Sequence, residues 1–195
     1  MPAAPRGTHP RNPHAPRQGD GREIGLSEAE ATLSALKQEL EQRVLDSIEF
    51  RDQLTAVLPP EAVVEACQFL KQRGYDLLIG LTASDHWPEL PRFEMLYQLF
   101  STEKNSLIGL SVRLEGEEPK VPSIESVYRN ANWHEREVFD MFGIDFPGHS
   151  DLRRILMPMD WEGHPLRRDY PLGYEEVQFT FNFDEIEKRK KYAQE

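Results

Sequence analysis

Cysteine is nearly absent from this sequence: Cys67 is the only one among 195 residues. A single cysteine excludes disulfide bonds within the chain. It also excludes an iron–sulfur cluster held by the chain's own thiolates, because such a cluster needs several. Cys67 shares a helical apolar pattern with Val63, Val64 and Leu70. We therefore predict a buried structural thiol rather than a reactive one, since nothing nearby in the sequence would lower its pKa.

The sequence also lacks long apolar runs, a basic surplus and a dinucleotide-binding fingerprint. No stretch approaches the ~20 apolar residues of a membrane-spanning helix, so membrane contact is expected only through partners. The formal net charge of −11 argues against nucleic acid as the main partner, because phosphate binding requires a basic face. No strand–helix–strand unit carries the glycine pattern that cradles NAD or flavin, so we predict no cofactor in this chain.

Composition divides the chain into four regions. Residues 1–22 contain five prolines and four arginines but almost no large apolar side chain. They cannot bury enough surface to fold, and we predict a disordered tail. The tail is basic but lacks the amphipathic pattern of a transit peptide. The other regions are predicted as an α+β domain at 23–146, an irregular charged docking segment at 147–172 and an extended C-terminal arm at 173–195.

Periodicity predicts the elements of the domain. Ser27 as an N-cap, with Glu30 three residues on, favours a helix that runs to about Gln42. A second helix is expected between Pro60 and Gly74. Apolar, branched and aromatic stretches predict five strands, at 44–50, 54–58, 75–82, 92–101 and 106–114, with 102–105 as an antiparallel hairpin loop. Helices before and after such strands indicate an α+β fold, with an antiparallel or mixed sheet and the helices packed on one face.

A short helix is predicted within the stretch from Trp133 to Ile144. Gly143 can take the left-handed conformation that ends a helix. The apolar residues of this stretch fall on one side of the helix. Arg136 and Asp140 lie four residues apart, and we predict an ion pair between them.

Two stretches that follow this helix echo each other, at 148–156 and 163–172. Each opens with Gly-His and continues to Leu-Arg-Arg, which places Arg153 and Arg154 in the first and Arg167 and Arg168 in the second. Their glycines and prolines disfavour regular structure. Two roles stay open for each arginine: an internal charge network that holds the segment, or bidentate pairing to carboxylates on a partner.

Several polar residues invite catalytic interpretations, and each is weak. The ligand-type residues of the region lack the His-x-x-x-His spacing that puts two imidazoles on one helix face. No nucleophile-elbow pattern surrounds Ser123 or Ser150. Glu135 and Glu137 are two residues apart on a helix and do not face each other. We therefore predict no catalytic residue and no metal site, although His149, Asp151 and His164 leave a metal-dependent hydrolase as a distant alternative.

The same residues carry a resemblance to a known family. The stretches Glu-Arg-Glu-x-x-Asp-x-x-Gly-Ile, Gly-His-x-Asp-Leu-Arg-Arg-Ile-Leu and Gly-His-Pro-Leu-Arg-Arg-Asp-Tyr-Pro-Leu follow one another within about forty positions. In this order they resemble the hydrophilic thirty-kilodalton (30 kDa) subunit of respiratory complex I, the NADH:quinone oxidoreductase. A weaker resemblance extends back to about Leu58. The sequence departs from the commonest pattern at Ser150, where proline is usual, and at Arg168, where lysine is frequent.

The resemblance implies a structural and assembly role without a redox centre. It places this chain against the large subunit that helps to form the quinone-reduction site, beside other subunits of the peripheral arm. NADH, flavin, iron–sulfur clusters and quinone would then belong to partner subunits. The chain would be a peripheral membrane protein on the cytoplasmic side, attached through the complex. An equivalent subunit of a membrane-bound hydrogenase-type complex fits the same motifs.

The predicted partner-binding residues come from the motif region and the arm. In the arm, Val177, Phe179, Phe181 and Phe183 would share one side of an extended strand, and three exposed phenylalanines require a cover. That cover is expected to be the large partner, or alternatively the edge of the chain's own sheet. The complete set is Glu135, Arg136, Glu137, Asp140, His149, Asp151, Arg153, Arg154, His164, Arg167, Arg168, Asp169, Tyr170, Phe179, Phe181 and Phe183.

Overall fold

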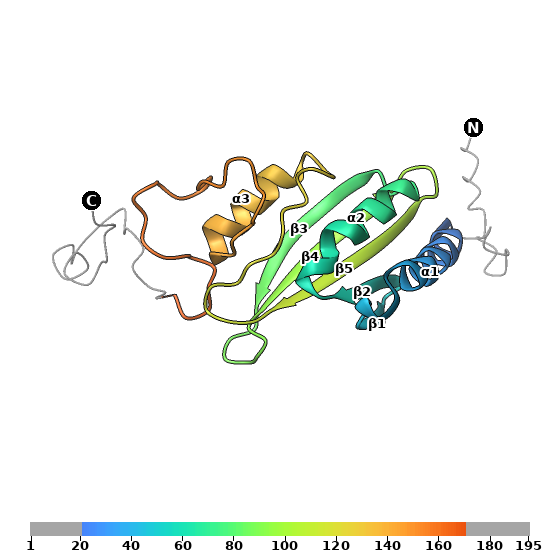
Figure 1. Ribbon diagram of the computed structural model, residues 1–195, viewed down its shortest axis with the longest axis horizontal. Coiled ribbons are helices and arrows are strands. Elements are labelled where there is room, and N and C mark those ends of the chain that lie inside the picture. The colour runs from blue at the N-terminus through green and yellow to red at the C-terminus, as the bar shows by residue number, and fades with distance from the viewer. Residues whose placement is uncertain (1–20, 171–195) are drawn as a thin grey trace, which may run out of the picture.

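The computed structural model describes residues 21–170, which form one sheet with helices packed against it (Figure 1). In chain order the elements are α1 (Gly21–Leu40), the 3-10 turn η1 (Glu41–Arg43), β1 (Asp46–Phe50), β2 (Gln53–Leu58), the 3-10 turn η2 (Pro60–Ala62), α2 (Val63–Gln72), β3 (Leu77–Asp85), β4 (Phe93–Ser101), β5 (Ser106–Leu114) and α3 (Ala131–Phe142). The predicted arm residues, among them Phe179, Phe181 and Phe183, lie outside the described part.

The sheet is mixed, with the strand order β1-β2-β5-β4-β3. The β1–β2, β4–β5 and β3–β4 pairs are antiparallel, whereas β2 and β5 run parallel. A parallel pair needs a long crossover connection, and here α2, β3 and β4 lie between β2 and β5 in the chain. The predicted α+β class, the strand at 106–114 and the hairpin loop at 102–105 are confirmed.

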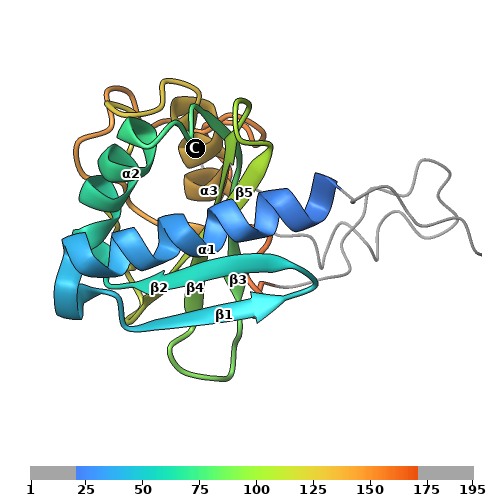
Figure 2. The ribbon, with the colours of Figure 1, turned by 90° about the vertical axis from the view of Figure 1, so that its right-hand side faces the viewer.

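One face of the sheet builds the core together with the helices. The helix α1 buries Ala29, Leu33, Leu36 and Leu40, whose spacing of three and four residues defines one helix face. Figure 2 shows α1 lying along β2. The strand residues facing this layer alternate, as expected for a sheet that is buried on one side.

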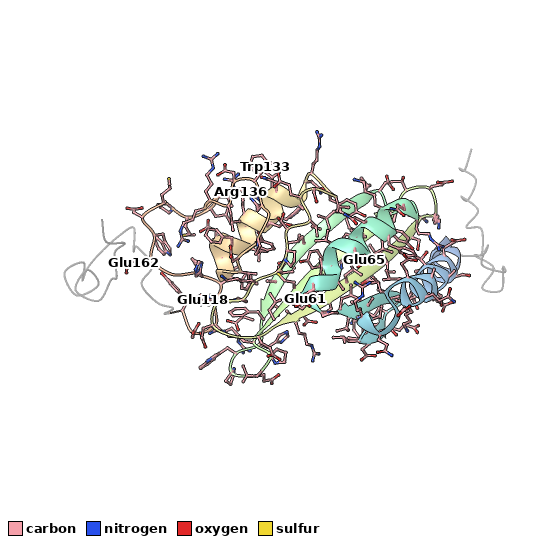
Figure 3. The ribbon with its side chains drawn as sticks, in the orientation of Figure 1. Glu61, Glu65, Glu118, Trp133, Arg136 and Glu162 are labelled. Carbon is pink, nitrogen blue, oxygen red and sulfur yellow. The ribbon has the colours of Figure 1, made fainter. Side chains whose placement is uncertain are left out.

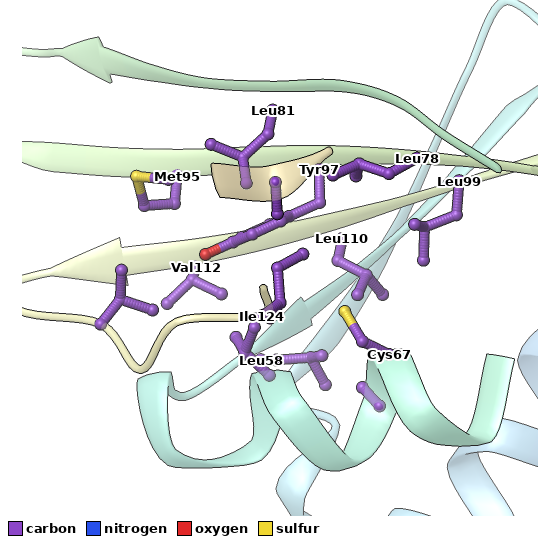
Figure 4. Packing of buried hydrophobic residues seen from close by; sticks show 14 of the residues in the cluster. Leu58, Cys67, Leu78, Leu81, Met95, Tyr97, Leu99, Leu110, Val112 and Ile124 are labelled. Atoms are coloured by element: carbon purple, nitrogen blue, oxygen red, sulfur yellow. The ribbon is translucent and has the colours of Figure 1, made fainter. Parts of the chain in front are cut away.

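The predicted buried thiol lies in this core. Cys67 is 0% exposed and packs among leucines and other apolar side chains between α2 and the sheet (Figure 4). Burial, with a smaller contribution from Glu135, raises the pKa of the thiol well above its ordinary value. Cys67 is therefore a small apolar packing residue and not a nucleophile.

Several predicted boundaries are wrong: the first strand begins at Asp46 rather than at residue 44, the third strand ends at Asp85 rather than at residue 82, and two further starts differ. The first helix begins at Gly21, so Ser27 lies inside it rather than at its cap, and the helix overlaps the predicted tail. A capping preference of about 1 kcal/mol does not stop a helix whose adjacent turns pack on a core. The third strand begins at Leu77 rather than at residue 75. The backbone groups of Tyr75 are bonded outside the sheet, since its N–H donates to the Leu70 carbonyl and its own carbonyl accepts from the Tyr128 hydroxyl. The Tyr75 side chain is buried in the core.

The helix α3 and the chain after it lie at the β3 side of the sheet (Figure 1). The helix ends as predicted at Gly143, which has a φ of 72°. From 147 to 170 the chain contains no helix or strand. We call residues 147–170 the docking segment, the described part of the region predicted under that name.

Candidate docking site

The docking segment is folded around one buried carboxylate, that of Asp140 on the last turn of α3. One carboxylate oxygen accepts the backbone N–H groups of Ile155, Leu156 and Met157 at 3.0, 2.7 and 2.8 Å, and the other accepts the guanidinium of Arg154 at 2.6 Å. Burial acts to raise the pKa of Asp140, but these hydrogen bonds outweigh it and hold the pKa below its ordinary value. Asp140 therefore acts as an internal anchor for the segment.

The last carbonyl groups of α3 are bound by side chains of the same segment. The Nδ1 atom of His164 lies 3.0 Å from the backbone oxygen of Asp140, and the Nε atom of Arg167 donates to the backbone oxygen of Phe142 at 2.6 Å. The final carbonyls of a helix have no partner within the helix, and its C-terminus favours positive charge. The Gly-His and Leu-Arg-Arg of the second stretch thus serve in part as a cap for α3.

Gly143 is required by this close approach. A Cβ atom at this position would lie 2.4 Å from the ring of His164 and 2.7 Å from the guanidinium of Arg167, and the φ of 72° is itself unfavourable for other residues. Burial lowers the pKa of His164 and so favours the neutral imidazole in its cap position. The same glycine that ends α3 gives the segment room to fold back over the helix.

The predicted ion pair between Arg136 and Asp140 is wrong. Arg136 instead donates to the backbone oxygens of Arg153 and Arg154 at 3.1 and 3.3 Å, and its guanidinium lies 5.2 Å from the ring centroid of Trp133. Figure 3 shows Arg136 and Trp133 together on the outer side of α3. Helical spacing brings positions 136 and 140 close, but each side chain finds better hydrogen bonds in the segment that covers the helix.

A second buried carboxylate lies next to the beginning of the segment. Glu135 is 0% exposed and accepts hydrogen bonds from the Ser123 hydroxyl at 2.6 Å and the Ile124 N–H at 2.8 Å. Its carboxylate lies 4.0 Å from Nε2 of His149, which also contacts the backbone oxygen of Asn132 at 3.2 Å. Burial raises the pKa of Glu135 against the effect of these bonds. Glu135, like Asp140, is engaged in hydrogen bonds within the chain.

The end of the segment is tied to the loop between β3 and β4. Arg92 is 4% exposed and pairs with Asp85 at 3.0 Å and with Asp169 at 2.5 Å, while the Arg168 N–H donates to Asp85 at 2.9 Å. Hydrogen bonding to Asp85 raises the pKa of Arg92, and Arg92 lowers that of Asp169. Asp85 and Arg92 were not among the predicted site residues. Their signal in the sequence is a charged residue at each end of a short proline loop between two apolar strands.

The predicted partner-binding residues of the described part divide by exposure. The exposed ones are Glu137, Asp151, Arg153, Arg168 and Asp169, and the half-buried ones are Arg154, His164, Arg167 and Tyr170. The side chain of His149 is fully buried. Those that are buried are Glu135, Arg136 and Asp140. Many charged side chains of the motifs therefore form ion pairs and hydrogen bonds within the chain, while others are exposed to solvent.

The family to which these motifs belong is shown by comparison with known proteins. The model of the family described as respiratory-chain NADH dehydrogenase, 30 Kd subunit, matches residues 56–176. This match covers more than half of the chain.

The chain belongs to the 30 kDa subunit family of respiratory NADH dehydrogenases.

Individual relatives agree with this membership. The chain is 46% identical over 166 residues to the C subunit of an NADH-quinone oxidoreductase of Roseiflexus sp. (strain RS-1), a match that covers 84% of this chain and 95% of the relative. Among solved structures, a trypsin-resistant fragment of Nqo5 is similar with a TM-score of 0.56 and 29% identity, covering 62% of this chain and 99% of the fragment. A chain of the membrane-bound sulfane sulfur reductase, an archaeal respiratory membrane complex, shares the fold with a TM-score of 0.66 and 20% identity, over 85% of this chain and 92% of that chain.

The family match includes the docking segment but leaves out α1. It begins within β2 and runs past the end of the described region, and so contains Asp140, Arg154, Arg92 and Asp169 together with the elements that carry them. Within residues 21–170, no helix is long and apolar enough to cross a membrane. In the same range, no three His, Cys, Asp or Glu side chains are grouped as metal ligands.

The structure adds a set of apolar residues that sequence reasoning missed. Leu156, Met159 and Leu166 of the docking segment are 58%, 88% and 53% exposed, and Trp133 on α3 is 61% exposed. For Leu156 and Met159 the signal was present in the Ile-Leu-Met-Pro-Met run, where apolar side chains fall in a stretch with no periodicity to bury them. Apolar side chains held outward on a well-bonded backbone are suited to binding another protein surface.

Proposed function

We propose that this member of the 30 kDa family is a non-catalytic structural and assembly subunit of a proton-translocating NADH:quinone oxidoreductase. Its docking segment packs on the large subunit that helps to form the quinone site, next to other subunits of the peripheral arm. The observation that carries the proposal is the contrast within this segment. Its polar groups are bound internally by Asp140, whereas Leu156, Met159 and Leu166 point to solvent.

A preorganised segment of this kind binds with a small entropy cost. The backbone N–H groups of residues 155–157 are already fixed on Asp140, so little ordering remains to oppose association. The exposed guanidinium of Arg168 adds a cation that can pair with a carboxylate on the partner. The exposed guanidinium of Arg153 pairs with Asp151 at 2.9 Å at the surface and can exchange that carboxylate for one on the partner. Arg154 and Arg167 support the surface from within. Arg154 and Arg167 thus have the internal role considered for the four arginines, and Arg153 and Arg168 are proposed for the role of pairing with the partner.

The redox chemistry of the complex is assigned to partner subunits. A chain with one cysteine cannot hold an iron–sulfur cluster by several of its own thiolates, and the sequence has no dinucleotide fingerprint. NADH, flavin, iron–sulfur clusters and quinone would therefore be bound elsewhere in the complex. The chain would lie at the cytoplasmic side of the membrane, attached through its partners. Purified, partner-free protein is expected to show no visible absorbance, and a retained flavin or cluster spectrum would contradict this assignment.

The docking surface is tested by placing charge on its apolar residues. The double variant Leu156→Asp/Met159→Asp should fold, because both side chains are exposed, but about tenfold less chain should co-purify with the large quinone-site subunit. Leu45→Asp is the matched control: Leu45 is 64% exposed and precedes β1, at the sheet edge opposite to β3. Equal recovery of the double variant and the control would contradict the proposal. Mass spectrometry of the co-purifying proteins separates an NADH:quinone complex from a hydrogenase-type complex.

The arm at 173–195 is proposed to extend the same contact. Its alternating Val177, Phe179, Phe181 and Phe183 offer one apolar side to a partner. Truncation after Leu172 should weaken co-purification with the large subunit and change the thermal midpoint of the isolated chain little. A collapse of the isolated domain after truncation would assign the arm to the chain's own core instead.

A further inference from the structure

The loop between β3 and β4, residues 86–92, presents the other prominent apolar side chains at this end of the molecule. Leu90 is 84% exposed and Trp87 is 46% exposed. Figures 1 and 2 show this loop projecting beyond the end of the sheet, away from the helix layer. Neither side chain contributes to the core of the described region.

The backbone of this loop is held firmly at its base. The His86 N–H donates to the Arg92 carbonyl at 2.7 Å, the Glu89 N–H to the His86 carbonyl at 2.9 Å, and the Trp87 N–H to the Asp85 carboxylate at 3.0 Å. The Asp85 carboxylate also binds the buried guanidinium of Arg92. Pro88 and Pro91 restrict φ further. A loop bonded in this way already holds Trp87 and Leu90 outward. Its binding therefore does not carry the entropy cost of ordering a mobile loop.

The same anchor joins this loop to the docking segment. Asp85 receives the Arg168 N–H at 2.9 Å, and Arg92 pairs with Asp169 at 2.5 Å. The loop and the end of the docking segment are therefore joined by one ion-pair cluster, in which Asp85 and Arg92 are buried and Asp169 is at the surface. A partner that covers the end of the docking segment also meets the loop.

The surroundings of the loop are acidic. Glu89 lies within it, and the exposed residues Glu115, Glu117 and Glu118 follow β5, whose last residue pairs with the first residue of β4. Glu117 is 3.6 Å from Arg92, and Figure 3 shows Glu118 at this end of the molecule. The exposed glutamates outnumber the exposed cations Arg113 and Arg168 at this end of the sheet. Apolar tips beside these glutamates fit a pocket that is apolar inside and carries basic groups at its rim.

We infer that loop 86–92 is a second docking anchor, which inserts Trp87 and Leu90 into an apolar, basic-rimmed pocket of the same subunit that receives the docking segment. This inference rests on the proposed function and adds to it a separate contact with its own chemistry. Tryptophan is enriched among residues that dominate binding energy at protein interfaces. The docking segment and the loop would bind as two points of one rigid surface, which sets the orientation of the chain on its partner.

The experiment is photo-crosslinking in the purified complex from two positions of the full chain. A photoreactive amino acid is placed at Leu90 in one variant and at Met159 in another, and the crosslinked partner is identified by mass. Both positions are expected to capture the same partner protein. Capture from Met159 but not from Leu90, or capture of a different partner from Leu90, overturns the second anchor and leaves the proposed function standing. Failure of Met159 to capture any protein of the complex overturns both.

Two further variants test the apolar contact and the contribution of the glutamates separately. Trp87→Ala/Leu90→Ala should weaken association with the partner about tenfold while keeping the thermal midpoint of the isolated chain. Glu117→Lys/Glu118→Lys should slow association and reduce its dependence on salt, because it removes the long-range attraction to a basic rim. Association unchanged in the first variant, or an unchanged salt dependence in the second, contradicts the corresponding half of the inference.

Discussion

The α+β layer and the docking segment of this chain are stabilised by different interactions. Residues of the layer, such as Leu99, Ile108 and Leu110, are 0% exposed and touch other apolar side chains. The docking segment buries little apolar surface of its own and is held by carboxylates and helix-end carbonyls, chiefly through Asp140. Burial of apolar surface is non-directional and insensitive to pH, whereas hydrogen bonds to a buried charge are directional and depend on ionisation. The two regions should therefore respond differently to substitution and to acid.

The largest effect is expected in the layer. Leu110→Ala removes a fully buried side chain in the central strand β5, and the cavity should cost about 2–5 kcal/mol of the free energy of unfolding. The whole described domain should lose stability together, because this residue belongs to the common core. Urea unfolding followed by circular dichroism measures the change in midpoint. Loss of structure in the docking segment alone, with the sheet unchanged, would contradict the assignment of Leu110 to the core that stabilises the layer.

Asp140→Asn should act on the docking segment first. The amide keeps the shape of the side chain but removes the charge that binds Arg154 and three backbone N–H groups, and breaking a buried pair in this way costs about 3 kcal/mol. Limited proteolysis should cut within 147–170 faster in the variant, while the circular dichroism of the sheet is retained. Exposed Glu137→Gln on the same helix is the matched control. Equal proteolysis of both variants would contradict the anchoring role of Asp140.

The two buried carboxylates of α3 should give opposite pH dependences. The pKa of Asp140 in the folded chain is lowered from 3.8, so its stabilising effect is present above that value and is lost as the pH falls through the folded pKa. The pKa of Glu135 is raised from 4.5, so ionisation costs more in the folded chain, and stability falls as the pH rises from 4.5 through the folded pKa.

Unfolding free energy measured against pH checks both signs. Glu135→Gln should lose the decline above pH 4.5 that is expected of the unsubstituted chain. Asp140→Asn should lose the decline at acid pH. Parallel pH profiles for the unsubstituted chain and both variants would contradict the assignment of either charge.

The smallest effect on stability is expected at the exposed arginines. Arg153→Ala and Arg168→Ala should each change the free energy of unfolding by no more than about 0.5 kcal/mol, since both side chains face solvent. Arg154→Ala should cost more, because it leaves Asp140 without its cation. The same two exposed substitutions should weaken assembly with the large subunit. Destabilisation by the Arg153 or Arg168 variant as large as that by Arg154→Ala would show that all four arginines belong to the internal network.

Local patterns predicted much of the fold because they report local physics. The strand at 106–114 alternates with period two and is found at the predicted residues, and Gly143 ends α3 in the left-handed conformation. The Ser27 signal failed because an N-cap preference is small compared with the packing of the helix on the sheet. Parallel pairing of β2 with β5 has no signature at short range, since the strands are joined only through α2 and the β3–β4 hairpin.

The sequence by itself determined the α+β class, the buried Cys67 and the concentration of charge and aromatics after residue 133. It could not assign partners to those charges. Helical spacing predicted Arg136 as the ion-pair partner of Asp140, but the guanidinium that binds Asp140 is that of Arg154. Arg92 binds Asp169, which lies 77 residues further along the chain. The physical reason is that a charged side chain pairs with whatever group the folded backbone brings within hydrogen-bond distance, and that distance is set by tertiary packing. Which arginines remain exposed to a partner was therefore decided only by the tertiary structure.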